Sequence, residues 1–204
     1  MQLQRLSRLS DLIFAGAMTL MVLTFEPLPL QEMTSQEVSV FLQAQLPSLG
    51  AYALTFVLIA YYWLAHLHQF QHYQKTDTVH LWLTLLSLMF IAVLPYANDL
   101  VTFYDRVFIL QVFYSLSVAG VGIFSTAAWI YATQQRRLVD PDLPDCTIQQ
   151  IRRESYAEPT VALLAIIGAW VHPLGWTLTF LVGLPLIFWI QTLLPSEKSE
   201  SESG

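Results

Sequence analysis

Charge is what this sequence has least of. Only 12% of its 204 residues are Asp, Glu, Lys or Arg, whereas soluble globular domains carry roughly 25%. Since 55% of the residues are hydrophobic, the surface cannot be wholly in contact with water. This composition excludes a disordered chain and an ordinary cytosolic enzyme, and it indicates an integral membrane protein.

Cysteine is nearly absent, and so are the short motifs of enzymes. The single cysteine, Cys146, excludes an internal disulfide and a metal site built on paired cysteines. The sequence holds no phosphate-binding glycine loop, no dinucleotide fingerprint and no hydrolase motif of the G-x-S-x-G or H-E-x-x-H type. The net charge is −6, and no basic run is long enough to indicate nucleic acid as a partner. We therefore expect neither an enzyme nor a nucleic-acid-binding protein.

The five histidines are the remaining candidates for a metal or haem site. His68 and His72 stand four residues apart, which is a possible ligand pair on a helix. No acidic residue or cysteine accompanies them there, so histidines that are hydrogen-bonded or lie at the membrane interface are the favoured interpretation. We expect no metal and no cofactor.

The charged residues fall in clusters, and the uncharged stretches between them predict the helices that cross the membrane. One crossing takes about 20 apolar residues. The stretch from Glu158 to Glu197 is too long for one crossing and contains the turn signal His172-Pro173-Leu174-Gly175, so it predicts two helices. We expect an all-α membrane domain over residues 1–195, with six helices at about 4–26, 48–72, 78–97, 106–134, 155–171 and 175–194. Residues 196–204 are rich in Ser and Glu and predict a disordered acidic tail.

The connection after the first helix is the longest one on its side of the membrane. Thr34-Ser35-Gln36-Glu37 matches the pattern of a helix capping box. The apolar residues Val38, Phe41, Leu42 and Leu46 follow at helical spacing. We expect a short amphipathic helix that lies on the membrane or packs on the other helices. No small-residue cleavage site follows the first helix, so we expect that helix to be retained.

The distribution of Lys and Arg predicts the orientation. With six spans both termini lie on one side, and that side holds Arg5, Arg8, Lys75, Arg136, Arg137, Arg152, Arg153 and Lys198. The other side holds only Arg106. Both termini are therefore expected in the cytoplasm, with the chain in the cell membrane. The outer connections carry acids that either concentrate cations or keep short loops hydrated: Glu26, Glu32, Glu37, Asp99 and Asp105.

The first helix carries the one acid expected at or inside the membrane, Asp11. Such a residue is costly and is a candidate for a functional or network role, with Arg8 as a possible partner. It could equally mark the inner end of the helix. Farther along, Gly16, Leu20 and Leu23 stand at i, i+4 and i+7, with Thr19 beside them. A stripe of this kind is typical of helix packing.

Three short motifs in the first three helices resemble those of a known family. Arg5-Leu6-Ser7-Arg8-Leu9-Ser10-Asp11 resembles the R-x-x-x-F-S-D signature of the endosomal and lysosomal potassium channel family, transmembrane protein 175. Tyr62-Trp63-Leu64-Ala65-His66 with Phe70 is similar to its second-helix Y-W-x-x-H pattern, and Leu81-Trp82-Leu83, Phe90 and Leu94-Pro95 are similar to its third helix. The sequence departs from the family at four positions, Leu9, Gly16, Leu67 and Thr84.

The resemblance implies a potassium-permeable cation channel in which four copies of a six-helix subunit place their first helices around a central pore. The positions that match the pore stripe are Gly16, Thr19, Leu20 and Leu23. Leu20 and Leu23 would form an apolar gate, and the Thr19 hydroxyl would contact a partly dehydrated cation, with modest selectivity for potassium over sodium. The resemblance also implies a polar network that positions the first helix, made of Arg5, Ser10, Asp11, Trp63 and His66.

The partners implied are further copies of the chain, the lipid bilayer and monovalent cations, with K⁺ as the permeant ion rather than a cofactor. Two other functions stay open: a secondary transporter coupled to ions or protons, and a membrane scaffold that transports nothing. Against a transporter, no charge is expected deep in the second to sixth helices, and no matched pair of broken helices is visible.

Overall fold

The computed structural model describes residues 2–25, 34–104 and 107–193. The predictions that concern residues 26–33, 105–106 and 194–204, among them the acidic tail, lie outside this range. Within it the chain is all-α, with no strand and one isolated bridge between Tyr73 and Val139. The helices are α1 (Gln2–Leu20), α2 (Ser35–Ala44), α3 (Leu46–Phe70), α4 (Thr78–Phe103), α5 (Phe108–Thr133), α6 (Asp145–Val171) and α7 (Pro173–Leu193). Two short 3₁₀ helices are η1 (Met21–Thr24) and η2 (Gln134–Arg136).

Among the described residues, four segments are long and apolar enough to cross a membrane, Gln2–Thr24, Leu46–Phe70, Thr78–Phe103 and Phe108–Arg136. They correspond to the first four predicted spans, so the chain is a multi-pass membrane protein. Helix α4 is longer than predicted, because it runs on from residue 97 through Asn98 and Asp99 to Phe103.

The predicted start of the fifth span, at residue 155, was wrong, because α6 begins at Asp145. Asp145 lies in the first helical turn, where a negative charge is favourable, and Pro144 stands just before it. The apolar residues Ile148 and Ile151 hold this first part of α6 in place, since both are buried against Trp129. The segment from 145 to 154 is therefore helical, although it lies between two of the predicted helices.

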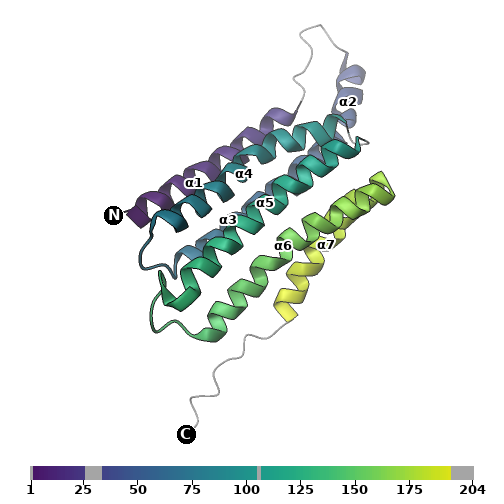
Figure 1. Cartoon of the computed structure of the whole chain (residues 1–204). Helices are drawn as coiled ribbons and strands as arrows, with labels where there is room; N and C mark the ends of the chain where they lie inside the picture. Colours follow the sequence, from purple (N-terminus) through teal and green to yellow (C-terminus); the bar gives the residue numbers. More distant parts are fainter. Residues whose placement is uncertain (1, 26–33, 105–106, 194–204) are drawn as a thin grey trace.

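The helices run alternately up and down (Figure 1). The start of α1, the α3–α4 connection and the α5–α6 connection lie at one end of the bundle, called here the N-terminal end. Helix α2, the end of α4 and the α6–α7 turn lie at the other end, called here the far end (Figure 1). Helix α1 packs on α4 and α3. Helix α5 lies between α4 and α6, and α7 packs on α6. Helix α1 therefore stands at one side of the bundle, with α6 and α7 at the other.

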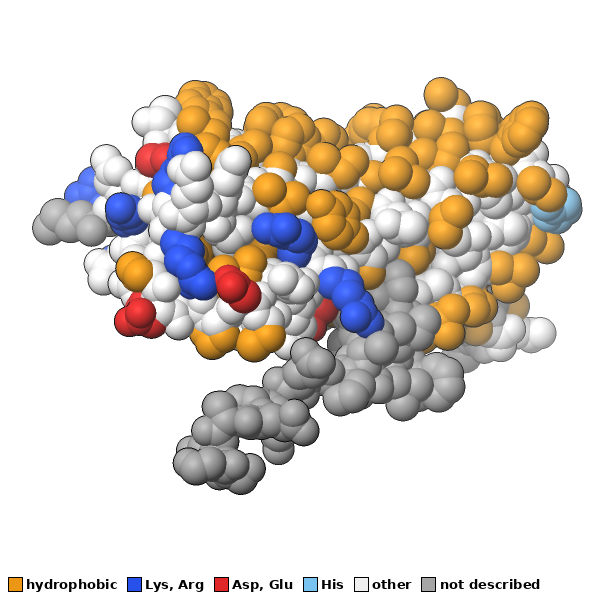
Figure 2. All heavy atoms as spheres, turned by 60° about the horizontal axis from the view of Figure 1, so that its bottom comes forward, with side chains coloured by type: hydrophobic (Ala, Val, Ile, Leu, Met, Phe, Trp, Pro, Cys, Tyr) orange, Lys and Arg blue, Asp and Glu red, His pale blue; other side chains and the backbone are white. Residues whose placement is uncertain are grey.

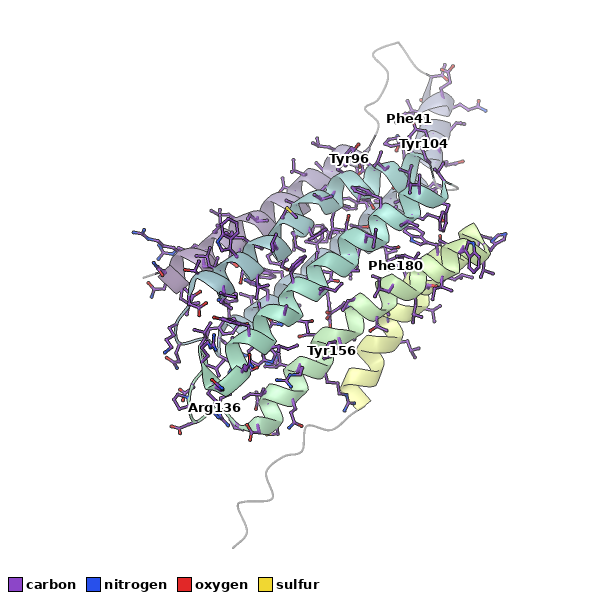
Figure 3. The ribbon with its side chains drawn as sticks, viewed as in Figure 1. Phe41, Tyr96, Tyr104, Arg136, Tyr156 and Phe180 are labelled. Carbon is purple, nitrogen blue, oxygen red and sulfur yellow. The ribbon has the colours of Figure 1, made fainter. Side chains whose placement is uncertain are left out.

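The short amphipathic helix predicted after the first span is confirmed. The Thr34 side chain accepts from the Glu37 N–H, and the Glu37 carboxylate accepts from the Thr34 N–H at 2.8 Å, which completes the capping box. No residue of α2 is buried. Phe41 of α2 and Tyr104 after α4 mark the far end, whereas Arg136 lies at the N-terminal end (Figure 3).

Close contact between α5 and α6 depends on a glycine and a proline. A Cβ at Gly122 would lie 2.6 Å from Cδ of Pro159, so only glycine permits this approach. Pro159 has no N–H and leaves the Ser155 carbonyl without its helical donor. The Thr126 hydroxyl donates to that carbonyl at 2.8 Å and thereby repairs the bond inside the bundle.

Candidate functional site

Helix α1 has one buried face and one exposed face along its whole length. Its buried residues, together with those of η1, are Leu6, Ser10, Phe14, Ala17, Met21 and Thr24. On the opposite face Leu12 is 71% exposed, Leu20 is 52% exposed and Leu23 is 70% exposed. An apolar face of this length must lie against lipid or against another protein chain.

The predicted stripe lies on that exposed face. Thr19, Leu20 and Leu23 are exposed, and Gly16 is half-buried in a place where an added Cβ would meet no atom within 4 Å. None of these four residues is fully buried in the subunit, so the helix packing that the stripe predicts is not seen inside one chain. Their side chains are available to lipid, to water or to a further copy of the chain.

Thr19 is the polar residue of the stripe. Its hydroxyl donates to the Ala15 carbonyl at 2.8 Å, one turn back on the same helix. The hydroxyl proton is therefore used in a hydrogen bond to the backbone, and the hydroxyl oxygen can still accept a hydrogen bond or contact a cation. An oxygen acceptor among apolar side chains is the kind of group that contacts a cation.

Asp11 of α1 is hydrogen-bonded to α3. Its carboxylate accepts from the Trp63 indole N–H at 3.0 Å, so the structure gives it a partner on another helix rather than Arg8 on its own. His66, one turn after Trp63, lies beside the same helix, with its ring centroid 5.5 Å from that of Phe14. The His66 ring also stacks on Phe70 at 4.1 Å.

The other two residues of the predicted network lie apart from this pair. Ser10 is fully buried, but its hydroxyl donates to the Leu6 carbonyl of its own helix at 2.9 Å. Arg5 is exposed at the N-terminal end. The structure thus brings Asp11 and Trp63 together, places His66 beside α1, and does not join Ser10 or Arg5 to them by any bond described for these residues.

A second anchor, which the sequence analysis missed, lies at the far end of α1. The Thr24 hydroxyl in η1 donates to a carboxylate oxygen of Asp99 in α4 at 2.6 Å. The Asn98 side-chain amide donates to the same Thr24 oxygen at 3.4 Å. Asp99 was expected in an outer connection, but it belongs to α4 and holds the end of the first span.

This anchor rests on a buried polar chain that crosses the bundle. The Thr55 hydroxyl of α3 donates to the Asn98 side-chain oxygen at 2.8 Å and lies 2.8 Å from the Tyr114 hydroxyl of α5. The Tyr114 ring packs at 5.5 Å against Phe180 of α7, which faces the α5 side of the bundle (Figure 3). The end of α1 is thereby connected through α4, α3 and α5 to α7.

A carboxyl group also lies deep inside the bundle, contrary to the prediction that the second to sixth helices hold no buried charge. Glu158 of α6 is 5% exposed and is hydrogen-bonded to Tyr61 of α3. Nearby, the Gln69 amide donates to the Ser155 hydroxyl at 3.1 Å. The predicted start of the fifth helix at residue 155 places Glu158 in its first turn, but α6 begins at Asp145 and Glu158 lies in its interior.

The N-terminal end of α4 is capped by Asp77. Its carboxylate accepts from the His80 N–H at 3.0 Å and from the Tyr131 hydroxyl at 2.7 Å. Burial by itself would raise the pKa of Asp77, but these two hydrogen bonds outweigh it, and the pKa lies below the ordinary value for aspartate. Arg137 donates to the Tyr131 hydroxyl at 2.9 Å and extends the cluster.

The histidines form no metal cluster in the part of the chain that is described. His68 and His72 have ring centroids 5.6 Å apart, in agreement with their spacing on one helix face. No group of three or more His, Cys, Asp or Glu side chains that could hold a metal ion occurs among residues 2–25, 34–104 and 107–193.

Comparisons with known proteins identify the family of the chain. Residues 5–95 match the family model described as endosomal/lysosomal potassium channel TMEM175. The chain is 30% identical over 173 residues to a potassium channel of Streptomyces collinus, which covers 81% of this chain and 83% of that one. It is 23% identical over 176 residues to the endosomal/lysosomal proton channel TMEM175 of Gallus gallus, covering 79% of this chain and 34% of the chicken protein.

The fold is shared with a solved structure. The crystal structure of a lysosomal potassium-selective channel TMEM175 homolog from Chamaesiphon minutus superimposes with a TM-score of 0.78. The match covers 93% of this chain and 98% of that one at 20% sequence identity, which shows a common fold. The α1 signature, the shared fold and the Streptomyces relative together place the chain in the TMEM175 family of endosomal/lysosomal potassium channels.

Proposed function

We propose that this chain forms a potassium-permeable channel in which α1 lines the pore. The observation that carries the proposal is the exposed face of the first span, which is apolar from Leu9 to Leu23 except for Thr19 and its acceptor oxygen. The names of its relatives, a potassium channel of Streptomyces collinus among them, support the permeant ion. No enzymatic role is part of the proposal.

One copy of the chain cannot enclose a pore, because α1 packs on α4 and α3 at one side of the bundle. Four copies arranged with their α1 helices toward a common axis would turn the exposed stripe into a pore lining. The apolar faces of the other helices would then lie against lipid. The assembly proposed is therefore a homotetramer.

Six membrane spans per subunit are proposed, with α6 and α7 as the fifth and sixth. The alternation of the connections between the two ends of the bundle supports this number (Figure 1). Lys and Arg side chains gather toward the N-terminal end, while most of the rest of the same face is hydrophobic (Figure 2). This distribution supports cytoplasmic termini in a cell-membrane protein.

The proposed gate consists of Leu20 and Leu23. An apolar ring offers a hydrated ion few hydrogen-bond partners, and a small narrowing of such a ring expels water and stops conduction. Thr19, one position before Leu20, would supply oxygen contacts to the partly dehydrated cation. One turn before Leu20, Gly16 would leave the pore wider, since glycine has no side chain to place there. Potassium loses its water more readily than sodium, which gives modest selectivity.

The Asp11–Trp63 bond has a different role in this scheme. It lies between α1 and α3 within one subunit, so it sets the position of the pore helix rather than contacting the ion. His66 lies beside α1 near this bond, and we propose Arg5 and Ser10 as further members of the region that positions the helix.

The test is a flux assay on the purified protein in liposomes, with its mass measured in detergent. We expect potassium efflux down its gradient that does not saturate, a smaller sodium flux, and a mass of four chains. Leu23→Ser should increase the potassium flux, because a hydroxyl keeps the constriction wet. Leu20→Ser should act in the same direction.

The matched control is Leu178→Ser in α7. Leu178 is 58% exposed, close to the value for Leu20, but it lies on the opposite side of the bundle from α1. This variant should conduct like the unmodified protein. Saturable uptake coupled to an ion gradient would support a secondary transporter, and the absence of any flux from intact oligomers would support a scaffold; either result would overturn the proposal.

A further inference from the structure

The α1 helix changes its winding at the position of the proposed gate. It is an α-helix up to Leu20 and continues as the 3₁₀ helix η1 from Met21 to Thr24. In a 3₁₀ helix three residues make one turn, so side chains three positions apart lie directly above one another. Short 3₁₀ stretches at the end of an α-helix often mark a hinge.

This winding sorts the side chains of the segment into two stacked pairs. Met21 and Thr24 are buried, and Leu20 and Leu23 are exposed. Each pair is separated by three residues. The 3₁₀ turn therefore keeps both leucines on the exposed face while both anchoring side chains face the bundle.

The 3₁₀ turn is held by groups from other helices. Thr24 is 1% exposed, and its hydroxyl donates to Asp99 at 2.6 Å. Just beyond it the Phe25 ring packs at 5.2 Å against Tyr52 of α3, and the Phe25 N–H donates to the Val22 carbonyl at 3.3 Å. Phe25 itself is extended, so the helix ends there.

We propose that Asp99 is a positioning residue of the gate: by accepting from Thr24 it keeps the end of α1 in the 3₁₀ form that holds Leu23 in line with Leu20. The inference rests on the proposed function, because it assumes that these two leucines line the pore. It adds a residue on a different helix, which does not itself contact the ion, to the set that determines the shape of the constriction.

The Thr24–Asp99 bond favours one of two conformations of residues 21–24, the 3₁₀ form over the α-helical form. Rewinding η1 as an α-helix turns each residue by about 20° less, which rotates Leu23 by about 60° relative to Leu20 over three residues. The same rotation carries the Thr24 hydroxyl away from Asp99. The Thr24–Asp99 bond thus stabilises one of the two forms, and its loss shifts the population toward the other.

Asp99 is well suited to this role because its surroundings are fixed. Its neighbour Asn98 is 1% exposed and is held by Thr55, which is 2.8 Å from Tyr114. Asp99 is thereby presented from a rigid part of α4, while the segment it holds is a four-residue turn at the end of a helix.

The experiment measures the position of residue 23 directly. In a Cys146→Ser background, which removes the single cysteine, Leu23→Cys is introduced and the protein is reconstituted in liposomes. A positively charged methanethiosulfonate reagent is supplied on both sides of the membrane, and its rate of block of the potassium flux is recorded. The rate is then compared with and without Asp99→Leu and Thr24→Val.

Both variants should change the rate of block about tenfold, because a hydrogen bond to a charged group shifts an equilibrium by about that factor. Both remove the Thr24–Asp99 bond, and Thr24→Val also removes the longer bond from Asn98, so the double variant should change the rate little beyond Thr24→Val alone. Thr24→Ser, which keeps the hydroxyl, should restore the original rate. Thr102→Val is the matched control, because the Thr102 hydroxyl donates at 2.7 Å to the Asn98 carbonyl of its own helix and joins no other element.

Two failures can be told apart. If the reagent modifies Leu23→Cys without affecting the flux, residue 23 does not line the pore and the proposed function is overturned. If the reagent blocks the flux, but at the same rate in Asp99→Leu and Thr24→Val oligomers of unchanged mass, the positioning role of Asp99 is overturned alone. Variants that lose their oligomeric mass are replaced by Asp99→Asn, whose side-chain oxygen still accepts from Thr24 and should keep the original rate; a tenfold change in Asp99→Asn also overturns the proposal.

Discussion

Carboxylates hold the first span at two points, but they come from opposite partners. In the middle of α1, Asp11 belongs to the span and accepts from Trp63 of α3. At the far end Thr24 belongs to the first span and donates to Asp99 of α4. The first anchor holds regular α-helix, and the second holds a 3₁₀ turn.

We expect the two bonds to have different roles in the first span. The Asp11–Trp63 bond joins two regular α-helices, so it determines where α1 stands in the subunit. The far anchor joins a short turn, which can rewind, to a buried polar chain that reaches α7. Loss of the first should therefore damage the fold and the assembly, whereas loss of the second should change the shape of the proposed constriction.

Asp11→Ala is expected to have the largest effect on stability. It leaves the partly buried Trp63 indole N–H without its acceptor, which costs about 2–3 kcal/mol of the free energy of unfolding. The unfolding midpoint in detergent, followed by circular dichroism, and the oligomeric mass should both fall. Trp63→Phe should cause a similar loss, and the double variant should add little to it. Oligomers of normal stability with an altered potassium-to-sodium ratio would contradict this division of tasks.

Thr55→Val tests the base of the far anchor and should cost less, about 1–2 kcal/mol of the free energy of unfolding. Valine keeps the shape of threonine but leaves Asn98 and Tyr114 without the hydroxyl between them. We expect oligomers of unchanged mass, a lower unfolding midpoint and an altered potassium flux, while the oligomeric mass of Asp11→Ala is reduced. An effect on mass as large as that of Asp11→Ala would mean that the two ends do not differ in role.

The fold was largely predictable from the placement of charge and apolar residues. Long uncharged stretches gave the first four spans, and Thr34 and Glu37 gave the capped helix α2. The start of α6 was not predictable in this way, because residues 145–154 are polar in composition. They are helical because Ile148 and Ile151 pack against Trp129, a contact between separate parts of the chain.

The same distinction applies to the candidate site. The α1 signature and the Trp63–His66 pattern are local, so they could be recognised in the sequence. The family resemblance placed Asp11 and Trp63 in one network, and the two side chains are hydrogen-bonded in the structure. Thr24 and Asp99 are 75 positions apart, and neither lies in a motif. Only the packing of α1 on α4 brings them together, so periodicity and spacing could not pair them.

A pH titration extends the comparison to the connections at the N-terminal end. Hydrogen bonds from His80 and Tyr131 hold the pKa of Asp77 below its ordinary value. A carboxyl whose pKa is lower in the folded chain stabilises the fold above its unfolded pKa, and that contribution is lost as the pH falls through the folded value. When the pH is lowered below about 4, the unfolding midpoint of the unmodified protein should therefore decrease. Asp77→Asn should weaken this loss, while Asp142→Asn, on an exposed loop residue, should leave it unchanged.

Gly16→Ala tests the segment between the two anchors and should have the smallest effect on stability. An added Cβ at Gly16 meets no atom within 4 Å in the subunit, so no clash opposes it, and alanine favours the helix by up to about 1 kcal/mol. The unfolding midpoint should stay the same or rise. If α1 faces a pore, four added methyl groups narrow it and the potassium flux should fall. Gly122→Ala provides the contrast, because its Cβ would lie 2.6 Å from Pro159 and should lower the midpoint. A rise in stability at residue 16 without any change in flux would place the exposed face of α1 against lipid, and the two anchors would then hold a structural helix rather than a pore lining.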